Sequence, residues 1–197
     1  MNMWSLYEYQ PSFMLGFHGC DKQVGESLLD GSETHLMKSE KEYDWLGHGI
    51  YFWEGNPTRA LEWAHQRKAQ GKIQEPFVIG AVIGLGHCLD LFDQSALNEV
   101  RDAYLQLKKT FRKSGKTLPE NVGKKPDRVG RKLDCMVLNY LHQYRELSNL
   151  EPYDSIRGPF LEGKPLYRKA GFRTNNHIQL CVRSISTIKG YFRPIVP

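Results

Sequence analysis

The order of apolar patterns along the chain most narrows the folds available to it. Five strand-like runs alternate with helical patterns at first, and the last two runs follow each other at the end of the chain. The runs are residues 12–18, 48–53, 76–83, 177–182 and 187–192. Long polar connections separate several segments, and this order favours an α+β fold over a repeating βαβ unit. The length of 197 residues fits one domain spanning residues 1–197.

Helix starts are marked by capping residues. Asp21, Asn56 and Asp93 each precede a helical pattern, and Pro57 occupies the first helical position after Asn56. A further helix is predicted over 133–144, because its apolar residues recur at steps of three and four. The sequence therefore predicts four helices, each of which falls between two of the strand-like runs.

The connections are predicted from polar, glycine and proline content. Residues 32–44 and 114–130 are polar and are expected to be loops. Residues 149–175 contain repeated proline and glycine and are expected to be irregular throughout.

Composition indicates a soluble globular protein, because 40% of the residues are apolar and 25% are charged. The amino terminus lacks the pattern of a signal peptide, and the most apolar run, 77–85, is too short to cross a bilayer. The cysteines are far apart and form no CxxC pair, which argues against a zinc site or a disulfide scaffold. They are Cys20, Cys88, Cys135 and Cys181. We expect a cytoplasmic protein with reduced thiols and no membrane association.

The net charge of +5 is concentrated in one segment. Between Lys108 and Lys132, ten Lys or Arg residues face only Glu120 and Asp127, a local balance of +8. The rest of the chain sums to −3, so this segment is a candidate contact for an anionic partner such as nucleic acid. The alternative is a solvated helix end and loop that binds nothing.

Two short segments carry the functional prediction. LGFHG ends the first strand at His18-Gly19, and GHGIYF places Tyr51 33 residues after His18, before a capped helix and a β-branched strand. Together they resemble the poly(ADP-ribose)-polymerase-like branch of ADP-ribosyltransferases, which has a His-Tyr-Glu signature spread over three strands. The resemblance implies an ADP-ribosyltransferase-like fold of split antiparallel β-sheets with flanking helices. It also implies NAD as substrate, without a metal.

The resemblance assigns roles to the first two signature residues and their neighbours. The family histidine bonds a ribose hydroxyl, the next glycine holds the nicotinamide carboxamide through its backbone, and the tyrosine stacks on the nicotinamide ring. Carried over, these are His18, Gly19 and Tyr51, and Gly49 joins them in the NAD site. A tyrosine face is a suitable platform for a flat leaving group.

The helix after GIYF supplies two further family positions. Trp63, twelve residues past Tyr51, is the candidate second stacking aromatic, and its alternative role is a core residue on the helix face. The family's small hydroxyl residue falls on Ala60, so one nicotinamide contact is missing here.

The third signature position falls on Gln179, with Asn176 as the alternative if the register slips. Cleavage of the nicotinamide–ribose bond builds positive charge on the sugar, as in glycoside cleavage. Glutamine can hydrogen-bond a ribose hydroxyl but cannot place a negative charge near that cation. Family members without the glutamate tend towards transfer of a single ADP-ribose or lose activity, so polymer elongation is the least expected activity.

The loop before the last signature strand offers two more candidates. Glu162 is a substitute carboxylate or an ordinary exposed loop residue, and Arg157 is a candidate partner for the NAD pyrophosphate.

The predicted function is an NAD-dependent mono-ADP-ribosyltransferase acting on a protein or nucleic acid, with a toxin or defence role as one setting. The catalytic candidates are His18, Tyr51, Gln179 and Glu162. Two alternatives stay open. The first is an NAD-binding module that has lost its chemistry, which Gln179 favours. The second is a nucleic-acid-binding protein that acts through the segment from Lys108 to Lys132.

Overall fold

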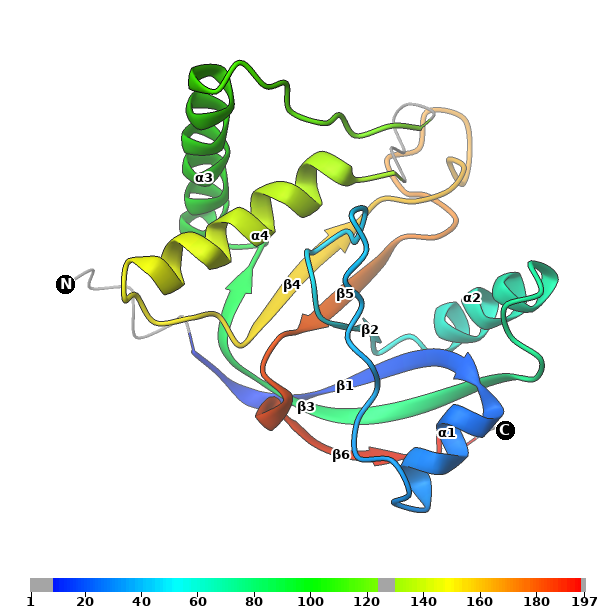
Figure 1. Cartoon of the computed structure of the whole chain (residues 1–197). Coiled ribbons are helices and arrows are strands. Elements are labelled where there is room, and N and C mark those ends of the chain that lie inside the picture. Colours follow the sequence, from blue (N-terminus) through cyan, green and yellow to red (C-terminus); the bar gives the residue numbers. More distant parts are fainter. Residues whose placement is uncertain (1–8, 124–129, 196–197) are drawn as a thin grey trace.

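The computed structural model describes residues 9–123 and 130–195. Helices and strands are mixed along the chain, which confirms the predicted α+β class (Figure 1). The strands are β1 (Tyr9–Asp21), β2 (Ile50–Glu54), β3 (Pro76–Asp90), β4 (Ser155–Phe160), β5 (His177–Val182) and β6 (Ile188–Phe192). The helices are α1 (Lys22–Leu29), α2 (Pro57–Ala69), α3 (Gln94–Lys113) and α4 (Lys132–Leu147).

Local capping chemistry sets three of the helix starts, as predicted. The Asp21 carboxylate accepts from the Gln23 amide at the start of α1. The Asn56 side chain accepts from the Arg59 amide, and Pro57 begins α2. The Asp93 carboxylate accepts from two amides at the start of α3. Each cap satisfies amide groups that the first helical turn leaves without a partner.

The six strands form one sheet in the order β1-β2-β5-β4-β3-β6, and β1 also pairs with β3. The long β3 pairs with β1 and β6 through its first part and with β4 through Cys88–Asp90. The β3–β4 pairing is parallel, and the other pairings among the described strands are antiparallel. The sheet therefore consists of a β6-β3-β1 half and a β2-β5-β4 half, joined at both ends.

The expectation that residues 149–175 are irregular throughout is wrong, because β4 lies within them. Gly158 and Pro159, which suggested a loop, are both accommodated in the strand. A side chain at Gly158 would come within 2.9 Å of Leu46. Pro159 lies beyond Arg157, the last β4 residue paired with β3.

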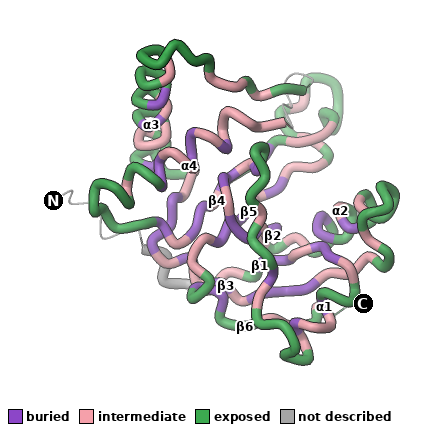
Figure 2. Tube along the Cα trace, viewed as in Figure 1, coloured by how far each residue is buried: buried purple, intermediate pink, exposed green. Residues whose placement is uncertain are grey.

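The helices cover different parts of the sheet (Figure 1). α3 and α4 pack over the β4 and β5 side with a core that includes Leu107, Leu141 and Ile156. α2 packs on β1 and β2 around Phe17, Trp53 and Ala60. In Figure 2 the buried residues follow the strands and the inner helix faces, whereas much of α3 is exposed. One side of α2 is left free to border a pocket.

Candidate functional site

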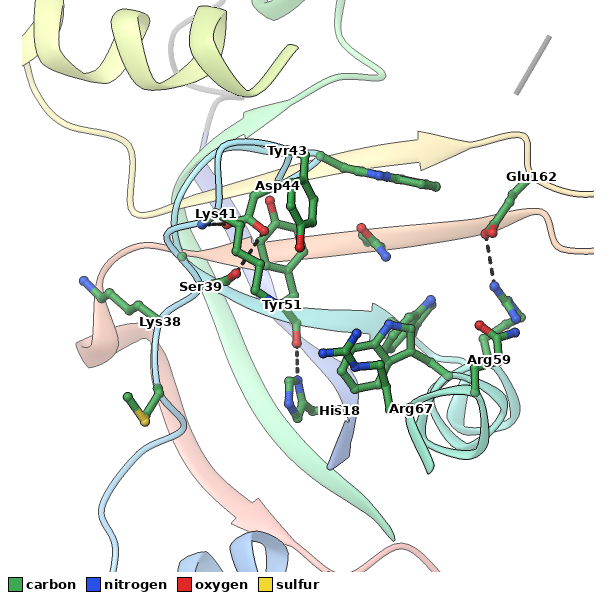
Figure 3. Close-up of a pocket in the computed structure, with 17 residues that line it drawn as sticks. His18, Lys38, Ser39, Lys41, Tyr43, Asp44, Tyr51, Arg59, Arg67 and Glu162 are labelled. Atoms are coloured by element: carbon green, nitrogen blue, oxygen red, sulfur yellow. Dashed lines mark hydrogen bonds and ion pairs between the residues drawn. The ribbon is translucent and has the colours of Figure 1, made fainter. Parts of the chain in front are cut away.

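A pocket lies where β1 and β2 separate. The two strands pair at Gly16–Glu54 and Phe17–Trp53, and the residues beyond these pairs border a pocket of about 540 Å³. α2 and the 37–45 segment form its sides (Figure 3). The lining residues are His18, Met37, Lys38, Ser39, Lys41, Tyr43, Asp44, Trp45, Gly49, Tyr51, Trp53, Arg59, Trp63, Gln66, Arg67, Glu162 and Gln179. Six predicted site residues are among them: His18, Gly49, Tyr51, Trp63, Glu162 and Gln179.

The tautomer of the His18 ring follows from the hydrogen bond that its Nδ1 atom makes. Nδ1 lies 2.7 Å from the Tyr51 carbonyl oxygen (Figure 3). Because a carbonyl oxygen can only accept, Nδ1 carries the proton and donates. Burial lowers the pKa of His18, so the ring is neutral at pH 7 and Nε2 is an acceptor. A neutral acceptor of this kind can accept a hydrogen bond from a ligand hydroxyl.

Tyr51 is fixed by two hydrogen bonds through its phenol oxygen. It donates to the Gly47 carbonyl at 2.6 Å and accepts from the Leu46 amide at 2.7 Å. Burial raises the pKa of Tyr51 well above its ordinary value, so the phenol stays neutral. With its hydroxyl already engaged, Tyr51 offers its ring to the pocket rather than an acid or a base.

Gln179 reaches the pocket from the middle of β5. Its backbone is held on both sides, opposite Trp53 of β2 and Gly158 of β4. The alternative residue, Asn176, precedes β5 and does not line the pocket. The structure therefore brings Gln179, not Asn176, together with His18 and Tyr51.

Tryptophan side chains form much of the apolar wall. The Trp63 ring lies 5.9 Å from the Trp53 ring and 6.3 Å from the His18 ring, measured between centroids. Trp63 is half-buried, so it both packs on its neighbours and borders the pocket. The Trp53 Nε1 atom is buried and has no hydrogen-bond partner among the described residues.

Glu162 enters the pocket from the loop between β4 and β5. Arg59 Nη2 lies 3.0 Å from its Oε2 atom, and His177 Nδ1 lies 3.7 Å from the same oxygen. Arg59 is 8% exposed and also pairs with Glu62. Burial lowers the pKa of His177, so Arg59 is the charged partner that holds the Glu162 carboxylate.

The cations of the pocket were not predicted from the sequence. Lys38 and Lys41 come from the 37–45 segment, and Arg59 and Arg67 from α2. Arg59, Trp63 and Arg67 recur every four residues and share one face of α2. That spacing was the available signal, but it also fits an ordinary solvated helix face. These four cations outnumber the two carboxylates of the pocket, Asp44 and Glu162, so the lining carries net positive charge.

Gly19 does not line the pocket. A Cβ atom there would lie 2.2 Å from the Ala60 carbonyl oxygen, so the glycine lets α2 approach β1. Ala60 itself is fully buried, on the side of α2 that packs on the sheet. The small hydroxyl residue expected from the family resemblance therefore has no counterpart in the pocket. The neighbouring residue Arg59 lines the pocket instead.

The structure also separates Arg157 from the pocket. Its guanidinium pairs with Glu54 at 2.6 and 2.9 Å and with Asp90 at 3.2 Å. It also lies over the Phe92 ring. Because Arg157 does not line the pocket and pairs with carboxylates elsewhere, the expectation that it meets a pyrophosphate bound there is corrected.

The described residues of the segment from Lys108 to Lys132, 108–123 and 130–132, do not line the pocket. Lys108, Lys109, Arg112 and Lys113 are on α3. Its Lys124, Lys125 and Arg128 lie outside the described residues.

Comparison with known proteins adds one distant relative. No protein-family model matches the chain, and no solved structure matches it. It is similar to an uncharacterized protein of Methanocaldococcus jannaschii, with 24% identity over 188 residues that cover 88% of this chain and 83% of the relative.

Three further observations concern metal ions, membrane helices and thiols. Within residues 9–123 and 130–195, no group of three or more His, Cys, Asp or Glu side chains is placed to hold a metal ion. No helix in that part of the chain has the length and apolar character of a membrane span. The four cysteines are buried and unpaired.

Proposed function

We propose that the protein binds NAD in this pocket and transfers one ADP-ribose unit to a macromolecule. The observation that carries the proposal is the meeting of His18, Tyr51 and Gln179. These residues come from three strands, were predicted as site residues from the sequence, and all line one pocket. An ADP-ribosyltransferase-like fold, with sheet halves that separate at the site, belongs to the same proposal.

Each part of the pocket matches a part of NAD. The Tyr51 and Trp63 rings are platforms for the nicotinamide. His18 Nε2 accepts a hydrogen bond from a ribose hydroxyl, and the Gln179 amide bonds the same sugar. Arg59 and Arg67 meet the pyrophosphate, the role first expected of Arg157.

The reaction breaks the bond between the nicotinamide nitrogen and the ribose carbon, and the electron pair leaves with nicotinamide. The sugar cation then takes a nucleophile from the acceptor, which loses a proton. Polarised ribose hydroxyls and a nearby negative charge stabilise the cation. In this pocket that charge comes from Glu162, because residue 179 is an amide.

A second candidate function is an NAD-binding module without chemistry. Gln179 favours it, since no carboxylate stands at the signature position. The enzyme would release nicotinamide upon incubation with NAD, whereas the binding module would not.

The test measures melting temperature with and without NAD. A ligand at one hundred times its Kd stabilises the folded state by about 2.7 kcal/mol. His18→Ala should abolish most of the NAD-dependent shift, and Tyr51→Ala should reduce it. His65→Ala and Tyr144→Ala, two exposed positions on α2 and α4, are matched controls. An unchanged shift in both pocket variants would place NAD elsewhere.

A further inference from the structure

The connection between β4 and β5 carries an unusual surface at the edge of the pocket. Residues 164–173, here called the basic–aromatic loop, have the sequence KPLYRKAGFR. Ten residues contain four Lys or Arg side chains, two aromatic rings and no Asp or Glu. In Figure 1 this connection projects from the ends of β4 and β5.

The two aromatic rings are held out in solvent. Tyr167 is 63% exposed and Phe172 is 65% exposed, and Leu166 beside them is 57% exposed. Large exposed apolar side chains that gather on one surface mark an interaction site more often than singly scattered ones do. The cations Lys164, Arg168 and Lys169 of the loop are exposed as well.

Backbone hydrogen bonds hold the loop in a hairpin-like form. The Leu166 amide donates to the Phe172 carbonyl at 3.1 Å, and the Thr174 amide donates to the Lys164 carbonyl at 2.9 Å. Arg173 Nη1 closes the base by donating to the Gly163 carbonyl at 2.9 Å. The exposed rings are therefore presented on an organised backbone.

The base of the loop is tied to the pocket. The Asn175 amide donates to the Glu162 carbonyl at 3.0 Å, and the Glu162 side chain lines the pocket two residues before Lys164. Arg131, at the end of the 108–132 segment, lies over the Phe160 ring at the end of β4. The basic 108–132 segment therefore ends beside β4, the strand that precedes the basic–aromatic loop.

We propose that the basic–aromatic loop binds single-stranded nucleic acid and guides it across the pocket. Lysine and arginine contact the phosphates, and the Tyr167 and Phe172 rings stack on bases. Exposed rings favour a single strand, because the bases of a duplex are already stacked on each other. The role of this strand as the acceptor of ADP-ribose rests on the proposed function. Its binding to the loop does not.

The binding test uses the full chain without NAD and a fluorescein-labelled 12-nucleotide strand of mixed sequence, as RNA and as DNA. Fluorescence anisotropy gives Kd at several salt concentrations. We expect Tyr167→Ala with Phe172→Ala to weaken binding at least roughly fivefold. Each phosphate contact of a single strand contributes about 0.7 to the slope of log Kd against log salt concentration. Lys164→Gln with Arg168→Gln removes two such contacts and should therefore lower this slope by about 1.4.

Lys108→Gln with Lys109→Gln is the matched charge control, on α3. It should change Kd less than the loop pair does. An equal or larger loss in this control would move the binding surface to α3 and overturn the proposal. So would equal affinity for a duplex of the same sequence, or binding of polyglutamate in place of the oligonucleotide.

The NAD melting shift separates this inference from the proposed function. Loop variants should keep the shift of the wild type, because the loop cations do not line the pocket. Oligonucleotide binding without any NAD shift would contradict the proposed function and leave the loop surface standing. An NAD shift without oligonucleotide binding would do the reverse.

Discussion

Gly19 links the packing of the fold to the shape of the pocket, and its substitution tests both. In Gly19→Ala the new Cβ atom would lie 2.2 Å from the Ala60 carbonyl oxygen and 3.3 Å from the Ala64 Cβ atom. Non-bonded heavy atoms are stable at separations of about 3.5 Å, so α2 has to move away from β1 by roughly 1 Å. The obstacle is backbone of a capped helix, which cannot rotate away as a side chain would.

The cost follows from the general penalty for overpacking a core, about 1–3 kcal/mol. We expect Gly19→Ala to lower the free energy of unfolding by about 2 kcal/mol. For a chain of this size that lowers the melting temperature by roughly 4–8 °C. The NAD-dependent shift should fall too, because α2 carries Arg59 and Trp63 into the pocket.

Urea denaturation and melting with and without NAD measure both effects. Gly190→Ala in β6 is the matched control, because a Cβ atom there meets no other atom within 4 Å. A Gly-to-Ala change without a clash is neutral or stabilises by about 0.4–1 kcal/mol. If Gly19→Ala is as stable as Gly190→Ala, the close approach of α2 to β1 is not what the glycine serves.

Two further predictions concern charge. Because Glu162 already supplies the negative charge in the proposed enzyme, Glu162→Gln should slow nicotinamide release, whereas Gln179→Glu should not speed it, since one of two neighbouring carboxylates would take up a proton. Faster release by Gln179→Glu would show that residue 179 only positions NAD and that Glu162 does not supply the charge. Burial lowers the pKa of His142 to about 3, below its unfolded value of 6.5. Only the unfolded state then binds this proton between pH 6.5 and 3, so the free energy of unfolding falls by about 1.4 kcal/mol per pH unit as the pH drops through that window. Urea denaturation at pH 7 and pH 4.5 should show a smaller loss for His142→Gln than for the wild type, and equal losses would contradict the assignment.

The sequence predicted best what local chemistry determines. Asp21, Asn56 and Asp93 cap helices through amides two or three residues away, so a short window contains the whole signal. β4 was missed because its pairing depends on β3 and β5, which are distant in sequence. Gly158 and Pro159 gave a strong local signal for a loop, and tertiary pairing overrode it.

The candidate site shows the same division between local and distant information. Its backbone positions at His18, Tyr51 and Gln179 were found from motifs within strands. The placement of Arg157 failed because its partners, Glu54 and Asp90, are 103 and 67 residues away. Arg59 was overlooked because its burial and its pairing with Glu162 arise only when the β4–β5 loop meets α2.

In the proposed enzyme, a carboxylate on a loop rather than on a strand would change how the chemistry is controlled. The backbone of a glutamate at position 179 would be fixed by strand pairing on both sides of β5. The Glu162 side chain, in contrast, is held mainly by its ion pair with Arg59. The other carboxylate of the pocket, Asp44, accepts from Ser39 and from the Lys41 amide and is committed to the 37–45 segment. A pyrophosphate that draws on Arg59 therefore competes with Glu162 for the same guanidinium. An acceptor strand bound to the basic–aromatic loop would lie next to the Glu162 backbone, which accepts from the Asn175 amide at the base of the loop. In the proposed enzyme, both substrates thus act on the position of one carboxylate, and neither has to move the sheet.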